Sequence, residues 1–299
     1  MVFRSTEVGQ RLRAYRLAAG LSADALGQRL NMSRATVYRL EASGVARLDT
    51  LACIAALLEV PTESLLGVGV EYVPSALAYF ERLRQIEEAA EHVFVAFGPV
   101  VYLLTSDGYD QALRAALLAQ ATAVTSRKRF AGEVDRLMEI LAARKRQYRQ
   151  RQPAITNVLS LPELVRFAET GLGEDPQDAR ARAAQRGMAR RELQTIAGLL
   201  EAPPIGVQIG ILFDELPATS FSVIRGHTST TALVSPFRLG ARLNVWRGIG
   251  MISNDPTSVA LHSGLARDLW KETVTGSKAA HYIRSKLLTL QAPMRRRAL

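Results

Sequence analysis

Arginine is the residue type that offers the most binding chemistry in this sequence. The chain has 299 residues, of which 33 are arginines and 5 are lysines, and its formal net charge is +10. A guanidinium group is planar and donates paired hydrogen bonds, which suits phosphate groups and the edge of guanine. The basic surplus therefore favours a polyanionic partner, nucleic acid before membrane, although a GC-rich genome also raises the number of arginines.

No arrangement of catalytic or metal-binding residues stands out. The single cysteine, Cys53, excludes a disulfide framework and a cysteine-based zinc site, and its apolar neighbours predict a buried thiol. The four histidines are too scattered for metal-ligand spacing, and no His-Glu-x-x-His motif occurs. We therefore expect no enzyme activity, no catalytic residue, no metal and no cofactor.

Five residues of the C-terminal third could bind a small molecule. An arginine near the end of a strand can hold a carboxylate or a phosphate, and a tryptophan can cover an apolar or ring-containing ligand. The candidates for contacts with such an anionic or apolar effector are Arg225, His227, Arg238, Arg242 and Trp246. The alternative is an ordinary sheet surface with exposed arginines and a tryptophan in the core.

A second basic feature is the segment 127–151. It holds nine basic and three acidic residues, whereas residues 1–70 carry a net charge of only +2. The segment could contact DNA, bind an anionic effector or form a solvated surface, and we expect the solvated surface.

The spacing of apolar residues predicts an α+β fold that is mainly helical, with a small antiparallel or mixed sheet. Residues 205–211 alternate with the period of two that is typical of a strand, and short apolar runs predict strands at 219–224, 231–234, 243–246 and 249–253. We expect a connecting helix at 71–92, which could form a dimer seam or pack within the fold. An effector-sensing and dimerisation domain would follow at 93–299, helical at 105–200 and sheet-containing at 205–299.

Residues 7–66 have the pattern of five short helices. Ser22 and Ser33 stand where a helix begins and can accept a hydrogen bond from the first turn. Gly20 and Gly44 stand where a helix ends, and only Asn31-Met32 separates the second helix from the third. Two helices joined by a short turn in such a bundle are typical of DNA-binding proteins.

The same segment resembles a known family. The matching positions, in order, are Gly20-Leu21-Ser22, Ala25-Leu26-Gly27, Asn31-Met32-Ser33, Val37, Leu40-Glu41, Gly44, Leu57, Val60 and Leu65-Leu66-Gly67. In type and spacing they resemble the Cro/CI-type helix-turn-helix of the XRE family of transcriptional regulators. The resemblance covers about 60 residues, one fifth of the chain, and implies a DNA-binding domain at 1–70.

The resemblance also implies which residues contact DNA. The third helix of the family lies in the major groove, so the base-reading positions here are Arg34, Ala35, Thr36, Tyr38 and Arg39. The positions implied for DNA phosphates are Ser22, Ser33 and Arg47. Glu41 would be structural, because a carboxylate repels phosphate. Where the family usually has a glutamine that contacts the DNA backbone, this sequence has Ala23 and lacks that contact.

These features predict a sequence-specific transcriptional regulator, a dimeric repressor whose C-terminal domain senses a small molecule. Paired domains on double-stranded, palindromic operator DNA would gain affinity by linkage. The N-terminus has no apolar signal segment, and the apolar run 93–104 is too short to span a bilayer. We therefore expect a cytoplasmic protein on chromosomal DNA, with no membrane partner. The alternative is an antitoxin-like or phage-defence interaction protein that uses the helix-turn-helix for autoregulation.

Overall fold

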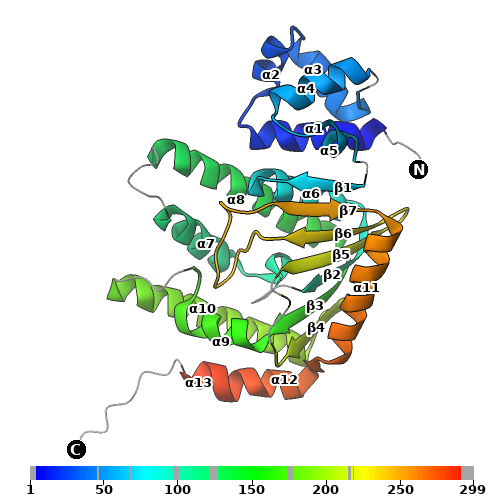
Figure 1. The fold of residues 1–299 in the computed structure, drawn as a ribbon. Coiled ribbons are helices and arrows are strands. Elements are labelled where there is room, and N and C mark those ends of the chain that lie inside the picture. Colours follow the sequence, from blue (N-terminus) through cyan, green and yellow to red (C-terminus); the bar gives the residue numbers. More distant parts are fainter. Residues whose placement is uncertain are drawn as a thin grey trace, which may run out of the picture.

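The computed structural model describes residues 5–45, 47–67, 69–96, 101–120, 127–173, 178–214, 217 and 219–290, with the backbone alone at 5, 127–129 and 290. A helical head (residues 5–67) stands on a larger body (residues 69–290) that is built around one sheet (Figure 1). The head contains α1 (Ser5–Ala18), α2 (Ala23–Arg29), α3 (Arg34–Ser43), α4 (Leu48–Leu57) and α5 (Thr62–Leu66). These are the five helices that the sequence predicts.

An apolar core and one tight turn hold the head together. Leu12, Leu26 and Ile54, from three different helices, are at most 1% exposed. A Cβ atom at position 27 would lie 2.5 Å from the carbonyl oxygen of Met32, so glycine is required where α2 approaches the turn before α3. Asn31 in that turn has a φ of 51°, a left-handed conformation that asparagine tolerates better than most residues.

The body contains a mixed sheet of eight strands. In spatial order they are β1 (Val70–Val73), β7 (Gly250–Ser253), β6 (Thr230–Ser235), β5 (Ser220–Gly226), β2 (Ala90–Ala96), β3 (Ala154–Ser160), β4 (Val207–Leu212) and β8 (Val274–Thr275). The three strands β2, β3 and β4 run parallel to one another, and the other neighbouring pairs are antiparallel. Parallel strands are usually buried on both faces, and β3 follows this rule because Val158 and Leu159, which point to opposite faces, are both 0% exposed.

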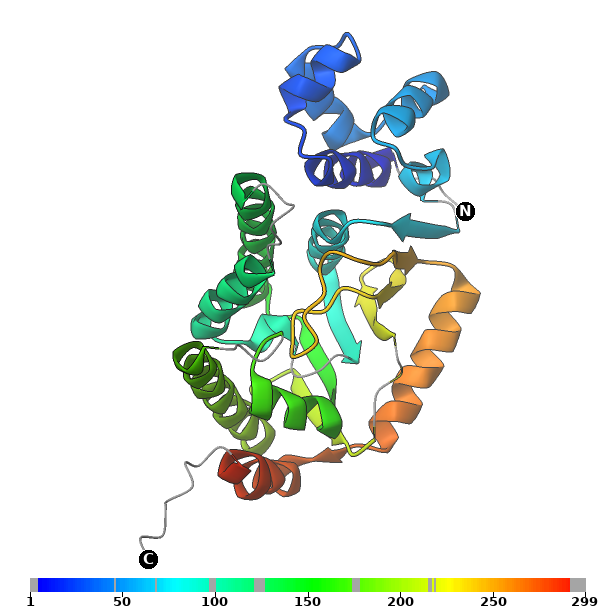
Figure 2. The same cartoon turned by 60° about the vertical axis from the view of Figure 1, so that its left-hand side comes forward.

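Helices cover the two faces of the sheet unequally. Most of them lie on one face, and α11 (Pro256–Lys271) crosses the other (Figure 2). The first face carries α6 (Ala76–Glu87), α7 (Asp107–Ala119), α8 (Arg127–Arg151), α9 (Leu161–Thr170) and α10 (Ala179–Glu201), with a 3-10 turn at Tyr102–Leu104 before α7. Near the end of the described chain, α12 (Gly276–Tyr282), a π-helical turn (Ile283–Leu287) and α13 (Leu288–Leu290) pack against α10.

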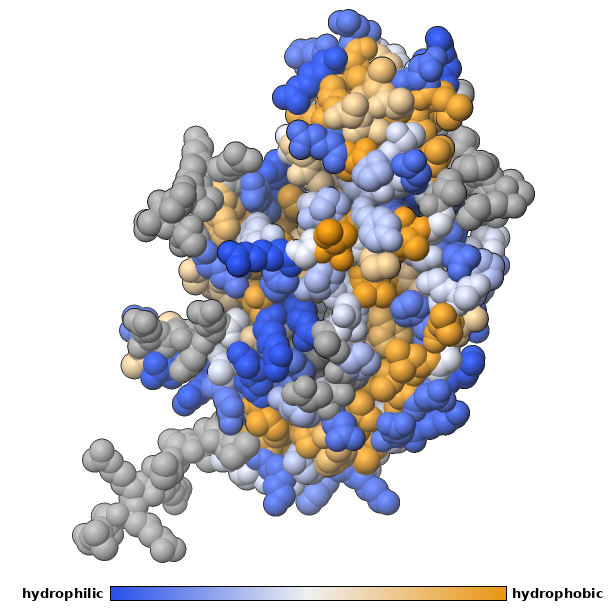
Figure 3. Space-filling view, viewed as in Figure 1, coloured by the Kyte–Doolittle hydropathy of each residue, from blue (hydrophilic) through white to orange (hydrophobic). Residues whose placement is uncertain are grey.

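The unequal cover divides the apolar residues into two cores. The larger core runs from the head through the space between the sheet and the many helices. The smaller core, around Phe94, Phe221 and Ala266, lies under α11. The outer side of α11 exposes 70% of Leu261 and 42% of Leu265, and apolar surface is visible over this helix in Figure 3. None of the helices in the described part of the chain is long and apolar enough to cross a membrane.

The predicted fold class, α+β and mainly helical with an N-terminal helix bundle, is confirmed. The sheet, however, is not confined to 205–299, because β1, β2 and β3 come from earlier in the chain. Residues 71–92 do not form one connecting helix, because α6 is preceded by β1 and followed by β2. The side chains of α6 are buried on several sides, which leaves no face of this helix for a dimer seam. Residues 243–246 form no strand and contribute only an isolated bridge between Arg238 and Asn244.

Cys53 also differs from its prediction, because its side chain is exposed. On α4, Leu51, Ile54 and Ala55 point into the head and are at most 2% exposed. Cys53 lies on the other side of this helix, so apolar neighbours in the sequence do not bury it.

Candidate nucleic-acid interface

The outer side of α3 carries the side chains expected to read bases. In the head, α1 faces the body and α3 lies on the side away from it (Figure 1). Arg34, Ala35 and Arg39 are exposed, Tyr38 is 47% exposed, and Thr36 is half-buried. The guanidinium group of Arg34 donates a hydrogen bond to the Tyr38 hydroxyl at 3.2 Å and lies 5.3 Å from the centre of its ring. The structure thus places the five side chains on one short helix, with Arg34 held by its neighbour.

Buried contacts fix the inner side of α3. Val37 is 1% exposed and belongs to the core. Glu41 accepts hydrogen bonds from Nε and Nη2 of Arg16 on α1, and Nη1 of Arg16 donates to the carbonyl oxygen of Leu21 at 2.7 Å. Because Arg16 and Glu41 are at most 9% exposed, the pair ties α3 to α1 inside the head, as expected of a structural Glu41.

The residues expected at DNA phosphates stand at the beginnings of three helices. The hydroxyls of Ser22 and Ser33 accept hydrogen bonds from the amides of Ala25 and Thr36, at 3.0 and 3.1 Å, so both cap their helices. The Arg47 side chain is 81% exposed, with one weak ion pair of 4.0 Å to Asp49. The side chain of Ala23 is buried.

The comparison with known families agrees with this geometry. Residues 7–66 match the family model described as a helix-turn-helix domain. The head is a helix-turn-helix domain. The match begins inside α1 and ends with α5, so it covers the part of the chain that holds the α2–turn–α3 unit.

Other comparisons add little. No curated protein matches the chain. Among solved structures, a similar one is that of TrmBL2, an archaeal chromatin protein reported to show a novel mode of DNA binding, with 12% identity and a TM-score of 0.32. The match covers 76% of this chain and 60% of that chain, so this chain spans less than two thirds of it. A TM-score this low does not establish a shared fold.

A buried polar cluster joins the helix-turn-helix head to the body. We call Arg11 of α1, Glu71 of β1, and Arg82 and Gln85 of α6 the junction cluster. The Glu71 carboxylate accepts hydrogen bonds from Nε of Arg11 at 3.1 Å and from Nε of Arg82 at 2.9 Å. Gln85 accepts a hydrogen bond from Nη1 of Arg82 at 2.6 Å and donates to the backbone carbonyl of Gln10 at 3.0 Å. These four residues are each at most 7% exposed, and their hydrogen bonds fix α1 on α6.

The basic segment 127–151 is α8, and two of its basic side chains are neutralised inside the body. The side chain of Arg144 pairs with Glu87 through two hydrogen bonds of 2.7 and 2.8 Å, and Lys145 pairs with Asp110 at 2.8 Å. Arg144 and Lys145 are 4% and 3% exposed, so the expectation of a solvated surface is wrong for both. The acidic partners come from α6 and α7, which a charge count along one helix does not reveal.

The five residues expected to contact an effector lie at three separate places. Arg225 and His227 stand where β5 ends, and their side chains are 64% and 65% exposed. Both lie near Glu91, at 4.0 Å from Arg225 and 2.7 Å from His227.

The other three candidates lie elsewhere. Arg238 and Arg242 both approach the carboxylate of Glu163, at 3.5 and 3.2 Å. Trp246 packs against Phe130 of α8, with ring centres 4.7 Å apart. The structure therefore does not bring the five candidates together around one pocket, since residues close in sequence here belong to separate strands and loops.

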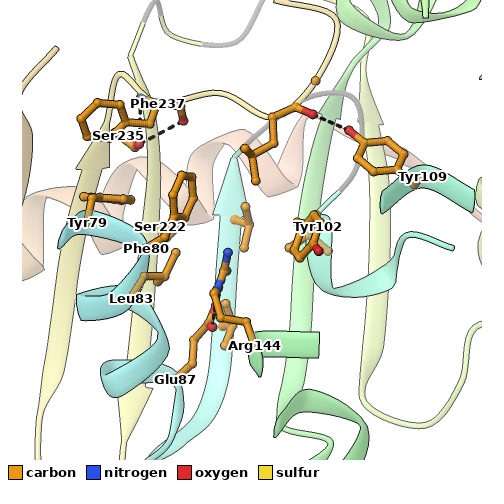
Figure 4. Close-up of a pocket in the computed structure, with 15 residues that line it drawn as sticks. Tyr79, Phe80, Leu83, Glu87, Tyr102, Tyr109, Arg144, Ser222, Ser235 and Phe237 are labelled. Atoms are coloured by element: carbon orange, nitrogen blue, oxygen red, sulfur yellow. Dashed lines mark hydrogen bonds and ion pairs between the residues drawn. The ribbon is translucent and has the colours of Figure 1, made fainter. Parts of the chain in front are cut away.

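A cavity that the sequence did not reveal lies inside the body, between α6, α8 and the sheet (Figure 4). Its aromatic lining comes from four parts of the chain: Tyr79, Phe80, Tyr102, Tyr109 and Phe237. The Arg144–Glu87 pair, Ser222 and Ser235 are its other polar lining groups. Because these residues come from several helices, strands and loops, neither a local motif nor a periodic pattern marks them in the sequence.

The tyrosine hydroxyls of this cavity differ in their partners. The Tyr109 hydroxyl donates a hydrogen bond to the carbonyl oxygen of Leu239 at 2.7 Å. The buried hydroxyls of Tyr79 and Tyr102 form no hydrogen bond of good geometry within the described residues, although Ser235 lies near the first and Asp110 near the second. Burial raises the pKa of all three phenols above its ordinary value, so the hydroxyls stay protonated. Elsewhere, no cluster of three or more His, Cys, Asp and Glu residues in the described chain could hold a metal ion.

Proposed function

We propose that this protein is a sequence-specific transcriptional regulator with a Cro/CI-type head, and that it acts as a dimeric repressor. The exposed row of side chains on α3, inside a segment that matches a helix-turn-helix domain, carries the proposal. The proposal gives the chain no catalytic role, and it gives the body the tasks of dimerisation and of binding a small effector.

In the proposed mode, α3 lies in the major groove with its first turns facing the bases. Arg34 and Arg39 are exposed and have the planar donor geometry that pairs with O6 and N7 of guanine. The contact between Arg34 and Tyr38 limits the conformations of this guanidinium, so less entropy is lost on binding. Ala35 and the Thr36 methyl group suit the methyl group of thymine.

Two heads would read two half-sites of a palindromic operator. A single helix-turn-helix contacts few base pairs, and linking two of them raises affinity through effective concentration. The junction cluster supports this arrangement, because it holds each head in a fixed orientation on its body.

The test begins with selection of a preferred site from random DNA by the full-length protein. Fluorescence anisotropy then compares the selected site with random DNA. Arg34→Ala and Arg39→Ala should each weaken binding to the selected site by about 1–3 kcal/mol and leave binding to random DNA nearly unchanged. The control, Arg114→Ala, removes an exposed arginine of α7 and should affect neither.

Equal losses on both DNAs would contradict direct base reading by α3. Sedimentation with DNA of one and of two half-sites tests the dimer, which should bind the longer site with two chains. Purification of the protein with another protein in a fixed ratio, and no selected DNA site, would favour an interaction protein instead.

A further inference from the structure

The internal cavity of the body has the lining of a small-molecule site. Its volume is about 60 Å³, whereas a cavity of about 150 Å³ admits benzene, so one aromatic ring fits only when the cavity walls move apart. Tyr79, Tyr109 and Phe237 are at most 2% exposed, so a ligand here would be enclosed mainly by aromatic rings.

The polar groups of the cavity define the ligand further. The hydroxyls of Tyr79 and Tyr102 are buried, and their nearest polar neighbours within the described residues, Ser235 and Asp110, do not meet them in good hydrogen-bond geometry. Arg144 donates hydrogen bonds from Nε and Nη2 to the carboxylate of Glu87, and its Nη1 has no hydrogen-bond partner among the described residues. All three groups can donate a hydrogen bond, and an acceptor oxygen on the ligand, with its two lone pairs, would accept from up to two of them.

The charge balance argues against an anion. The guanidinium of Arg144 is already neutralised by Glu87, through hydrogen bonds of 2.7 and 2.8 Å. A carboxylate ligand would leave one negative charge uncompensated in an apolar space, which is costly. An uncharged ligand avoids this cost.

The helix that lines the cavity also holds the DNA-binding head. On α6, Tyr79, Phe80 and Leu83 line the cavity, whereas Arg82 and Gln85 belong to the junction cluster. A shift or rotation of α6 that accommodates a ligand would therefore move the partners of Glu71 and of α1.

We propose that this cavity binds an uncharged, single-ring aromatic molecule that carries a hydrogen-bond-accepting oxygen, and that α6 transmits its binding to the helix-turn-helix head. The site differs from the places where Arg225, Arg238 and Trp246 lie. The binding site stands on the cavity alone, whereas the transmission to the head rests on the proposed function.

Fluorine NMR on the full-length protein tests the site with three probes. 4-Fluoroacetophenone has a ring and a carbonyl oxygen, fluorobenzene lacks the acceptor, and 4-fluorobenzoate adds a charge. We expect saturable binding of 4-fluoroacetophenone, and binding weaker by about tenfold or more for the other two, the loss expected for an unmade hydrogen bond or an unpaired charge. Absence of saturable binding by any probe, or fluorobenzene binding as tightly as 4-fluoroacetophenone, overturns the proposal.

Variants place the probe in the cavity. Tyr79→Phe with Tyr102→Phe removes both hydroxyls and keeps both rings, so binding of 4-fluoroacetophenone should weaken about tenfold while that of fluorobenzene stays unchanged. The control Tyr148→Phe changes a half-buried tyrosine of α8 that does not line the cavity, and it should have no effect. The double variant without probe should melt at the same or a higher temperature, because two buried hydroxyls without well-formed hydrogen bonds are gone. The single variants Tyr79→Phe and Tyr102→Phe are measured as well. If both single variants and the double variant bind 4-fluoroacetophenone as tightly as the unchanged protein, the proposal is overturned.

DNA anisotropy tests the transmission separately. Saturating 4-fluoroacetophenone should change the dissociation constant for the selected DNA site by about fivefold or more, and Glu71→Gln should abolish this response. If the probe binds in NMR but has no effect on DNA binding, the proposed transmission through α6 is overturned and the proposed binding site is retained. Failure of the protein without probe to bind any DNA overturns the proposed function, and the NMR result stands on its own.

Discussion

Replacing Glu71 by glutamine tests how the helix-turn-helix head is held on the body. The substitution keeps the shape of the side chain and removes the charge that faces Arg11 and Arg82, at 3.1 and 2.9 Å. All three side chains are at most 7% exposed, so the two guanidinium groups would lose a charged partner that bulk water does not readily replace. Removing one partner of a buried ion pair costs about 3–5 kcal/mol, and we expect Glu71→Gln to lower the free energy of unfolding by that amount.

Urea unfolding followed by far-UV circular dichroism measures this loss. The control Asp135→Asn breaks an ion pair with Arg114 in which both side chains are about half exposed, and its cost should stay below about 1 kcal/mol. Changing Arg11, Glu71 and Arg82 together to leucine should recover most of the loss, because no unpaired charge remains buried. A loss below about 1 kcal/mol for Glu71→Gln, or a triple variant no more stable than the single one, would refute this reasoning.

Two further predictions concern stability. The pKa of His92 is lowered because burial disfavours its charged form and Arg225 lies nearby, so the unfolded chain, whose histidine has a pKa of about 6.5, binds a proton more readily. The free energy of unfolding should therefore be highest above about pH 6.5 and should fall as the pH drops from there through the lowered pKa of His92. In urea titrations between pH 5 and 8, His92→Gln should flatten this decline. The control His281→Gln, at an exposed position, should leave the decline unchanged. Gly27→Ala should destabilise the protein by about 1–3 kcal/mol, because the new Cβ overlaps the carbonyl of Met32 at 2.5 Å, whereas Gly132→Ala on α8, with nothing within 4 Å, should raise the melting temperature. An equal effect of the two glycine variants would contradict the close approach in the turn.

The helix-turn-helix head could be predicted from the sequence because its signals are local. The caps at Ser22 and Ser33, and the glycine that lets α2 enter the turn, act within a few residues of their own positions. The exposed side of α3 follows from the same spacing, since Val37 and Glu41 are four residues apart and face inward together. Whether the residues on that side bind DNA stays a prediction.

The body could be predicted only in its class, because its decisive contacts join distant residues. The apolar run of β3 is interrupted by Asn157, which is 0% exposed and accepts a hydrogen bond from the amide of Val101 at 2.9 Å. A polar residue inside an apolar run argues against a buried strand until its partner is known. The cavity has the same origin, since Tyr79 and Phe237 lie with ring centres 5.6 Å apart although they are far apart in sequence.

The pairing of β1 with β7 has a consequence during protein synthesis. β1 follows directly after the head, but Val70 pairs with Ser253, about 180 residues later in the chain. At about 5–20 residues per second, a ribosome needs roughly 9–36 s to make that stretch. The helices of the head can form as soon as they leave the ribosome, whereas the strand that anchors Glu71 obtains its neighbour only late. A chain whose translation stops in this interval carries the complete surface of α3 on a head that lacks its sheet anchor. Under the proposed function, such fragments would compete with the finished protein for DNA.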